Sequence, residues 1–233
     1  MRTHMKPSLL RVDFHVHTNF SKDSLTRPER LVQACRRKGI DRLVVADHNT
    51  IAGALEAQAL DPERIIVGEE IMTTGGEILA AYVTTEVPPG LSAQETIERL
   101  RDQGAFISVS HPFDTLRKGQ WAREDLLEIA LLVDAIEVFN ARCMRTGSNR
   151  QAAQFALEHN LPGTAGSDAH AAFELGSTFM ILPQFEGPDE LRAVIGQAKI
   201  QARLSPWWVH FVSRYASSHK RWGRCLDNVV RPP

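Results

Sequence analysis

The 233-residue chain lacks several features that mark secreted, membrane or disulfide-rich proteins. Its three cysteines, Cys35, Cys143 and Cys225, are odd in number and show no paired spacing, so we expect reduced thiols in a cytoplasmic protein. No apolar run approaches the roughly 20 residues of a membrane span. No apolar segment of a signal peptide precedes the first expected strand. The sequence therefore predicts a cytoplasmic protein with no membrane span.

The chain also has little net charge. Its formal value is -1, so no global field points to a nucleic-acid or membrane partner. The charge is uneven, because residues from Arg203 to the end carry +5 and residues 1–202 carry -6. We therefore expect no stable nucleic-acid partner for the main part of the chain.

Two common catalytic motifs are missing as well. A GxSxG turn, which would present a serine nucleophile, does not occur, and neither does the GxxxxGK[ST] loop of P-loop NTPases. Internal repeats and low-complexity stretches are also lacking. With 43% hydrophobic and 24% charged residues, the chain is long enough for one barrel-sized globular domain.

Apolar runs typical of strands alternate with segments typical of helices. We expect strands at residues 9–12, 40–46, 64–67, 77–83, 105–110, 135–139, 164–167 and 179–182. We expect helices at residues 27–39, 50–60, 92–104, 124–132, 148–159 and 189–199. Ser92 and Glu95 have the spacing of a capping box at the start of the third helix. This alternation predicts a parallel sheet with helices outside, either a barrel or a doubly wound sheet.

Metal-binding side chains recur where the expected strands end. In the stretch Asp13-Phe14-His15-Val16-His17-Thr18, side chains at alternate positions share one face of the strand, so Asp13, His15 and His17 project together. The same placement holds for Asp47, His48, Glu70, His111, Asn140, Asp168 and His170. The carboxyl ends of strands gather on one face of a parallel barrel. Imidazoles and carboxylates there favour a site for Zn, Mn or Fe, whereas for a single pair the alternative is solvated histidines.

Four histidines do not follow this rule. We interpret them as surface or packing residues: His4, His159, His210 and His219.

These motifs together resemble those of the PHP (polymerase and histidinol phosphatase) family. The resemblance covers roughly residues 9–200 and rests on five motifs in order: Asp13-x-His15-x-His17-Thr18 with Asp23, Asp47-His48, Gly68-x-Glu70, Ser110-His111-Pro112 and Gly166-Ser167-Asp168-x-His170. It implies a distorted, seven-stranded (β/α) TIM-like barrel. It also implies hydrolysis of phosphoesters with two or three divalent metal ions.

The resemblance also implies a ligand set. His15, His17 and Asp168 would bind one metal, and Glu70 would bridge it to a second. His111 would bind the second metal, and Asp23, His48 and His170 would hold a third. Asp13 would act in catalysis by orienting a ligand histidine, and His48 would also belong to the catalytic residues.

One position departs from the family pattern. Where many members have Gly-His-Ile-Leu, this chain has Gly76-Glu77-Ile78-Leu79. A glutamate can bind the same metals and would favour a harder ion such as Mn. The alternative is that Glu77 is a solvated glutamate at a strand end.

Substrate binding is expected from the stretch after the strand at 135–139. Asn140 and Arg142 match an Asn-x-Arg-like substrate stretch of the family. Arg142 is the best candidate for binding the substrate phosphate, because a guanidinium can bind phosphate with two hydrogen bonds. Arg145 and Lys22 are weaker candidates, since loop cations are usually solvated. The alternative for Arg142 is pairing with an acid such as Glu137, or exposure to solvent.

The C-terminal segment differs from the rest, so we divide the chain into a barrel at residues 1–203 and an extension at residues 204–233. Its apolar residues fall at helical spacing: Trp207, Trp208, Phe211, Val212 and Tyr215. Around them lie Arg214, Lys220, Arg221 and Arg224. We expect a helix that docks its aromatic residues on the barrel or on a second subunit, giving a homo-oligomer. The alternative is a basic aromatic surface for a membrane interface or nucleic acid.

The sequence thus predicts a cytoplasmic phosphoesterase that acts on a phosphomonoester or nucleotide. A hydroxide bound to Mn, Zn or Fe would be its nucleophile. One alternative is an enzyme acting on oligonucleotides or nucleoside bisphosphates, and another is a catalytically silent PHP domain that only binds. The second is disfavoured because eight of the nine expected ligand positions hold the expected residue type.

Overall fold

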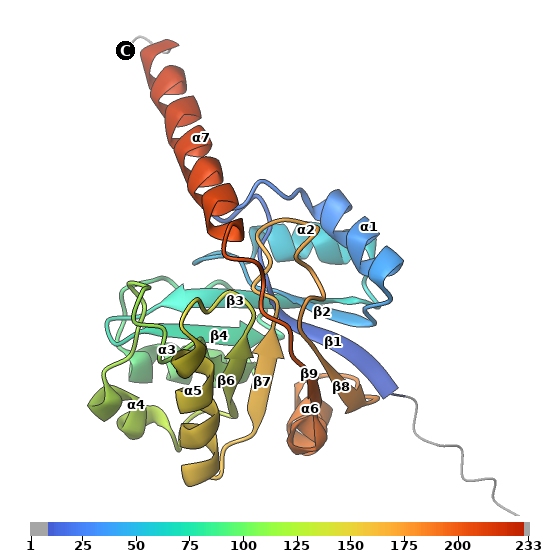
Figure 1. The fold of residues 1–233 in the computed structure, drawn as a ribbon, viewed down its shortest axis with the longest axis vertical. Helices are drawn as coiled ribbons and strands as arrows, with labels where there is room; N and C mark the ends of the chain where they lie inside the picture. The colour runs from blue at the N-terminus through green and yellow to red at the C-terminus, as the bar shows by residue number, and fades with distance from the viewer. Residues whose placement is uncertain (1–8, 231–233) are drawn as a thin grey trace, which may run out of the picture.

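A computed structural model describes residues 9–230, apart from the side chains of Thr146 and of residues 223–230. His4 and the side chains of Arg224 and Cys225 therefore lie outside the described residues. A single curved sheet forms the centre of the molecule, helices cover its outside, and the last helix projects from one end (Figure 1).

The sheet contains nine strands in the order β7-β6-β5-β4-β3-β2-β1-β8-β9. Their bounds are β1 Leu9–Val16, β2 Arg42–Val45, β3 Ile65–Met72, β4 Glu77–Ala81, β5 Phe106–Val109, β6 Ala135–Asn140, β7 Gly163–Gly166, β8 Phe179–Pro183 and β9 Lys199–Gln201. Strands β1 to β3 are parallel to one another, and so are β5 to β7. Strands β8 and β9 add antiparallel strands beside β1.

The sheet almost closes on itself between β1 and β7. Val16 forms a parallel bridge with Ala169, and the backbone N–H of His17 donates to the Ala169 carbonyl at 2.9 Å. Gly166 permits this approach, because a Cβ there would lie 2.4 Å from the Cβ of His15. The expected distorted TIM-like barrel is therefore confirmed.

Strand β4 breaks the expected parallel pattern. It follows β3 through a turn at residues 73–76 and pairs antiparallel with both β3 and β5. Because β4 runs in the opposite direction, its first residue, Glu77, lies at the barrel end where the parallel strands finish. The turn at residues 73–76 is expected from the sequence, but the expected parallel sheet is wrong at β4, because this tight turn reverses the chain direction.

Six helices flank the sheet. They are α1 Pro28–Lys38, α2 Ala52–Leu60, α3 Ala93–Asp102, α4 Arg123–Ile129, α5 Thr146–Glu158 and α6 Pro188–Val194. The capping box of α3 is confirmed, because the Ser92 side chain accepts from the Glu95 N–H while the Glu95 carboxylate accepts from the Ser92 N–H. The helix expected at 189–199 ends early: a 3₁₀ turn follows at Ile195–Gln197, and Lys199 already belongs to β9.

The last helix, α7 (Val209–Val230), extends away from the barrel (Figure 1). Trp208, just before it, stacks on Phe173 with ring centroids 5.4 Å apart. Trp207, Phe211 and Tyr215 are 69%, 56% and 64% exposed, so these three residues do not dock on the barrel, and their docking on a second subunit stays a prediction. Within residues 9–230, none of the helices combines the length and apolar character needed to cross a bilayer.

Two of the three cysteines can be placed. Cys35 and Cys143 are free and buried, and burial raises the pKa of Cys35 to about 12. These thiols are therefore protonated packing residues, as expected for reduced cysteines.

Glu69 is buried on the side of β3 opposite to Glu70. Burial raises its pKa to about 8 from 4.5. One carboxylate oxygen accepts from the Val87 N–H at 3.0 Å, and the other has no partner among the described residues. Ionised Glu69 is therefore unfavourable in the folded protein.

This burial predicts a pH-dependent stability. The pKa of Glu69 is higher in the folded than in the unfolded protein. Its contribution to the free energy of unfolding is therefore fully present below pH 4.5 and is lost as the pH rises through about 8. We expect Glu69→Gln to be more stable than wild type at pH 9, by up to about 4–5 kcal/mol, with a smaller difference at pH 6. Urea unfolding of both proteins at pH 6 and pH 9 measures the difference in stability. An equal difference at both pH values would contradict it.

Candidate metal centre

The barrel end formed by the carboxyl ends of the parallel strands brings the expected ligands together. They are His15, His17, Asp23, His48, Glu70, Glu77, His111, Asp168 and His170. Three groups of potential ligand atoms lie within 4.8 Å of one another: His17, His48 and His170; His15, His17 and Glu70; and His48, Glu70 and Glu77. The three groups overlap, so they form one continuous cluster.

Glu70 lies at the centre of this cluster. Its Oε1 is 3.3 Å from His15 Nε2 and 3.0 Å from His111 Nε2. Its Oε2 is 3.5 Å from His17 Nε2 and 3.0 Å from His48 Nδ1. Glu70 is thus the one carboxylate that approaches four of the histidines.

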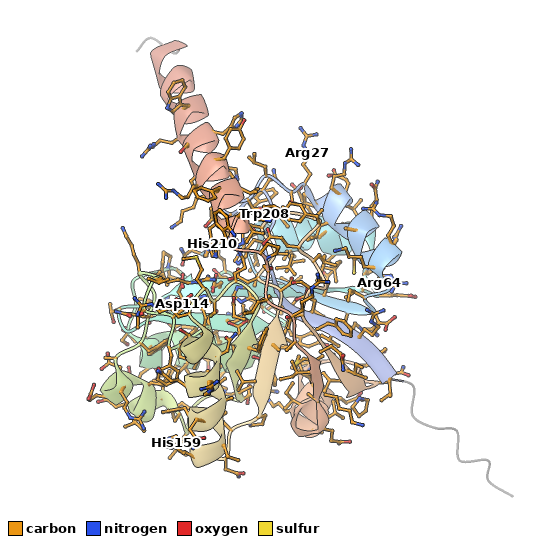
Figure 2. The ribbon with its side chains drawn as sticks, in the orientation of Figure 1. Arg27, Arg64, Asp114, His159, Trp208 and His210 are labelled. Carbon is orange, nitrogen blue, oxygen red and sulfur yellow. The ribbon has the colours of Figure 1, made fainter. Side chains whose placement is uncertain are left out.

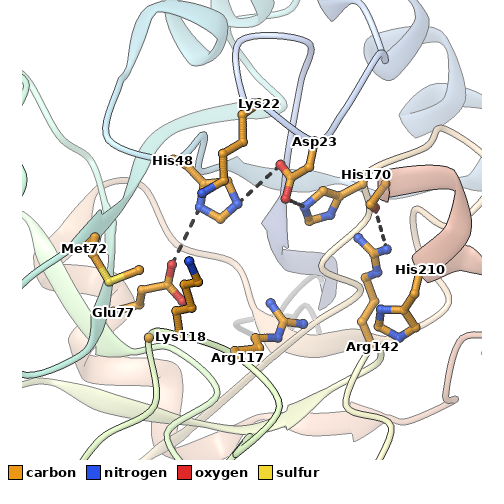
Figure 3. A pocket seen from close by; sticks show the side chains of 12 residues that line it. Lys22, Asp23, His48, Met72, Glu77, Arg117, Lys118, Arg142, His170 and His210 are labelled. Atoms are coloured by element: carbon orange, nitrogen blue, oxygen red, sulfur yellow. Dashed lines mark hydrogen bonds and ion pairs between the residues drawn. The ribbon is translucent and has the colours of Figure 1, made fainter. Parts of the chain in front are cut away.

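Asp168 and Asp23 lie on either side of this centre. Asp168 Oδ1 is 3.2 Å from His17 Nε2 and 3.9 Å from His15 Nε2. The two oxygens of Asp23 lie 3.5 Å from His48 Nε2 and 3.4 Å from His170 Nε2, as the dashed lines in Figure 3 show. The residues that the family resemblance assigns to separate metals are therefore adjacent.

Glu77 joins the same cluster. Its Oε1 is 3.8 Å from His48 Nδ1, and its Oε2 is 3.6 Å from His111 Nε2. The residue is only 6% exposed, so the alternative of a solvated strand-end glutamate is wrong. Burial, then the charge of Glu70, raise the pKa of Glu77, which means that this carboxylate ionises readily only beside added positive charge.

Several buried polar atoms at the cluster have no hydrogen-bond partner among the described residues. They are Glu70 Oε2, Asp168 Oδ1, Asp23 Oδ1 and His111 Nδ1. The Nε2 atoms of His15 and His17 also face each other at 3.0 Å. Buried polar atoms are rarely left without a partner, and imidazole nitrogens with carboxylate oxygens suit Zn, Mn or Fe. The donor set thus fits divalent metal ions.

The charges at the site point the same way. Burial favours a neutral His15, but the carboxylates of Glu70, Asp168 and Glu137 raise its pKa well above the usual value. Burial opposes ionisation of Glu70, yet neighbouring histidines hold the pKa of this carboxyl well below its usual range. The carboxylates therefore create a position that attracts positive charge.

Neighbouring groups orient the imidazoles. His15 Nδ1 lies 3.1 Å from Glu137 Oε1, and His17 Nδ1 lies 3.2 Å from the Ser21 hydroxyl. His170 Nδ1 donates to the Asp168 carbonyl at 2.8 Å. These contacts direct the three Nε2 atoms into the cluster.

Asp13 was expected to orient a ligand histidine; its carboxylate accepts from the backbone N–H of His15 at 3.5 Å, whereas Glu137 contacts the His15 ring. The Asp13 carboxylate accepts from the hydroxyl and N–H of Ser167 at 2.6 and 2.8 Å and from the Gly176 N–H at 2.9 Å. It therefore fixes the backbone next to Asp168. The sequence indicates Glu137 only weakly, because it lies within a strand and not at its end.

Asp47 has a similar supporting position. Its carboxylate accepts from the hydroxyls and the N–H groups of Thr18 and Ser21. These bonds hold the loop that carries Asp23 against β2.

The cluster opens into a pocket of about 250 Å³. Lining side chains include Lys22, Asp23, His48, Met72, Glu77, Arg117, Lys118, Arg142, His170, His210 and Ser213 (Figure 3). Four of them are lysine or arginine, so the part of the pocket beyond the carboxylates suits an anion.

Arg117 is the main residue that the sequence analysis misses. Its guanidinium donates to the Asp168 carboxylate, and its Nη1 lies 3.1 Å from His111 Nε2. Burial opposes ionisation of Asp168, but the charge of Arg117 helps to hold its pKa well below the usual range. Arg117 lies in the loop after β5, away from any strand end, so the strand-end rule could not find it.

The expected substrate residues have three different positions. The side-chain amide of Asn140 donates to Glu137 and Asp168, both at 3.1 Å, so it supports the ligands and does not line the pocket. Arg142 lines the pocket and pairs with Glu174 at 3.4 Å, not with Glu137. Arg145 is exposed and donates to the Thr115 hydroxyl, which does not support a role in substrate binding.

The remaining histidines divide in two. His159 lies at the barrel end opposite to Trp208 and His210 (Figure 2), and His219 is exposed on α7. Both agree with the surface or packing interpretation. His210 lines the pocket, so that interpretation is wrong for this residue.

Known proteins resemble the chain along most of its length. The sequence profile of the PHP domain matches residues 13–102, and that of a PHP-associated region matches residues 146–200. The protein MJ0417 of Methanocaldococcus jannaschii is 35% identical over 187 residues, which cover 78% of this chain and 75% of that protein.

Solved structures share the fold. A protein of Bifidobacterium adolescentis described as a candidate metal-dependent phosphoesterase has a TM-score of 0.61 at 19% identity, covering 81% of this chain and 96% of that one. The lesion-specific endonuclease PfuEndoQ of Pyrococcus furiosus has a TM-score of 0.57 at 17% identity, covering 83% of this chain and 58% of that one. The chain therefore belongs to the PHP domain family.

Proposed function

We propose that this protein is a metal-dependent phosphoesterase that hydrolyses a small phosphomonoester or a mononucleotide. The observation that carries the proposal is the cluster of five histidines and four carboxylates, all buried except the partly exposed Asp23 and His48, at the floor of a pocket with a cationic wall. The histidines and carboxylates on one side of the pocket would hold the metal ions. The lysine and arginine side chains on the other side suit the negatively charged oxygens of a phosphate.

Two or three ions fit the overlapping groups. His15, His17 and Asp168 would hold one ion, with Glu70 shared with a second ion at His111 and Glu77. His48, Asp23 and His170 would hold a third. Divalent ions held by these residues would lower the pKa of a water molecule and neutralise charge on a phosphoryl group.

The protein's own residues have separate tasks in this proposal. Burial lowers the pKa of His17 well below its usual value, so its imidazole stays neutral and able to bind a metal. Arg117 orients Asp168, and Arg142 presents a guanidinium to a phosphate oxygen. Lys22 and Lys118 add positive charge at the pocket wall.

The size of the pocket and the charge of the barrel favour a small substrate. A volume of about 250 Å³ lies below the roughly 300–1,000 Å³ of sites for drug-sized ligands. Residues 1–202 carry a net charge of -6, which disfavours a long polyanion. A domain that only binds has no reason to keep this complete ligand set, so we favour catalysis.

The test is hydrolysis of phosphomonoesters, nucleotides and short oligonucleotides by the purified full chain with Mn²⁺, Zn²⁺ or Fe²⁺. We expect turnover of a small phosphomonoester or a mononucleotide, its loss after chelation, and its recovery when one of these ions returns. Hydrolysis that persists in metal-depleted protein would contradict the proposal. So would the absence of hydrolysis in protein shown to be fully loaded with metal.

A further inference from the structure

The first turns of α7 form part of the pocket wall. His210 and Ser213 both line the pocket (Figure 3). Two residues before the helix are tied to the barrel, since the Ser205 N–H donates to the Ala141 carbonyl at 2.8 Å and Trp208 stacks on Phe173. The C-terminal extension is thus in contact with the loops that carry the site.

Farther along, α7 is also tied to the loop after β1. The Lys220 ammonium donates to the carbonyls of Asn19 and Ser21. Ser21 in turn contacts the His17 ring and the Asp47 carboxylate. The helix is therefore fixed relative to the metal-binding residues at two points about three turns apart.

Arg142 is the residue of the pocket wall most dependent on α7. Its Nη2 donates to the Ser213 hydroxyl at 2.6 Å and to the Val209 carbonyl at 3.1 Å. Its Nε lies 3.4 Å from Glu174 Oε2, but this pair lacks hydrogen-bond geometry. Both of these hydrogen bonds of the guanidinium are thus made to residues of α7. An arginine has four rotatable side-chain bonds, so it needs such contacts to keep one orientation.

His210 stands beside Arg142, across the pocket from Met72 and Glu77 (Figure 3). Its imidazole lines the same cavity as the ligands Asp23, His48, Glu77 and His170. A phosphate held between the cluster and Arg142 would direct its esterified group toward this side. An imidazole can donate or accept one hydrogen bond there.

We propose that α7 completes the substrate site: Ser213 and the Val209 carbonyl position Arg142 for a phosphate oxygen, and His210 contacts the group esterified to that phosphate. This inference rests on the proposed phosphoesterase function. It makes Ser213 a positioning residue and His210 a determinant of specificity for esters whose leaving group carries a hydrogen-bonding atom.

The first test is binding of inorganic phosphate to the Mn²⁺-loaded full chain, measured by titration calorimetry. We expect Ser213→Ala to weaken phosphate binding about tenfold, the size of one hydrogen bond to a charged group, with Mn²⁺ content unchanged. Arg142→Ala should weaken binding roughly ten- to a hundredfold. Ser213→Thr keeps the hydroxyl and should restore most of the affinity. The matched control is Ser218→Ala, an exposed serine on the same helix, which should bind phosphate as wild type does.

The second test concerns His210. We expect His210→Ala to raise KM for phosphomonoesters with a polar leaving group at least threefold, with kcat and phosphate affinity near wild type. His219→Ala, an exposed histidine on α7, is the control and should leave both constants unchanged. An unchanged KM for His210→Ala with every such ester would overturn the assignment of His210.

The outcomes separate this inference from the proposed function. If Ser213→Ala binds phosphate as tightly as wild type, with its metal content and unfolding midpoint intact, the positioning role is wrong even where hydrolysis occurs. A wild-type protein loaded with Mn²⁺ that binds no phosphate would also overturn it. If Ser213→Ala loses affinity while the wild type hydrolyses no ester, the helix still completes a phosphate site and the proposed reaction fails.

Discussion

Replacing His17 by alanine should remove most of the bound metal and nearly all hydrolytic activity. His17 belongs to two of the three groups of ligand atoms and lies 3.5 Å from Glu70 and 3.2 Å from Asp168. Loss of a residue that only orients a ligand typically costs about 10–100-fold in metal affinity or activity. Loss of the ligand itself should cost more, and we expect kcat/KM to fall at least about a thousandfold.

Metal analysis and steady-state kinetics measure the two effects on the same preparation. His219→Ala is the control, because it removes an exposed imidazole from α7 and should keep metal and activity at the wild-type level. His17→Ala that retains both full metal content and full activity would show that the cluster is not the active site. An unchanged unfolding midpoint in metal-free protein separates the loss of a ligand from a loss of folding.

The second large effect is expected when the central carboxylate is neutralised. Glu70→Gln removes the negative charge and replaces by an amide nitrogen one of the two oxygens that approach four histidines, so binding of more than one ion should weaken. Glu77→Gln makes the same chemical change at a residue that approaches two histidines, His48 and His111, so at most one ion should be affected. We expect Glu70→Gln to lose at least about a hundredfold more activity than Glu77→Gln.

Titration of metal-free protein with Mn²⁺ gives the number of ions that each variant binds. We expect Glu70→Gln to bind fewer ions than Glu77→Gln, and the wild type to bind the most. Equal stoichiometry in all three proteins would contradict a shared central carboxylate. If Glu77→Gln lost more bound ions than Glu70→Gln, the centre of the metal site would lie nearer to β4.

Most of the cluster is predictable because it follows a local rule. His15 and His17 alternate along one strand, and a side chain that ends a parallel strand must lie at one end of the barrel. This rule needs only the position of each apolar run. It therefore finds ligands that are more than 150 residues apart, such as His15 and Asp168.

The parts that fail do not follow from the positions of strand ends. The reversed direction of β4 follows from a tight turn at residues 73–76, and only this reversal makes Glu77 a buried member of the cluster. Arg117 lies in a loop, and Glu137 lies within a strand, so neither is marked by position in the sequence. The place of His210 depends on where α7 docks, which helical spacing alone cannot give.

Asp13 shows a further limit of pattern reasoning. The period of the strand correctly places it on the same face as His15, but its partner is decided by the approach of β7 at Gly166 and Ser167. The face of a strand is encoded locally, whereas the partner of a side chain on that face is a property of the closed barrel.

The most direct test of a metal site at this end of the barrel is the anomalous scattering of Mn²⁺ in crystals of the protein grown with that ion. We expect two or three adjacent peaks enclosed by the nine ligand side chains, one of them between Glu70 and the paired Nε2 atoms of His15 and His17. Crystals saturated with Mn²⁺ that show no peak within this cluster, or peaks only at exposed surface carboxylates, would contradict it.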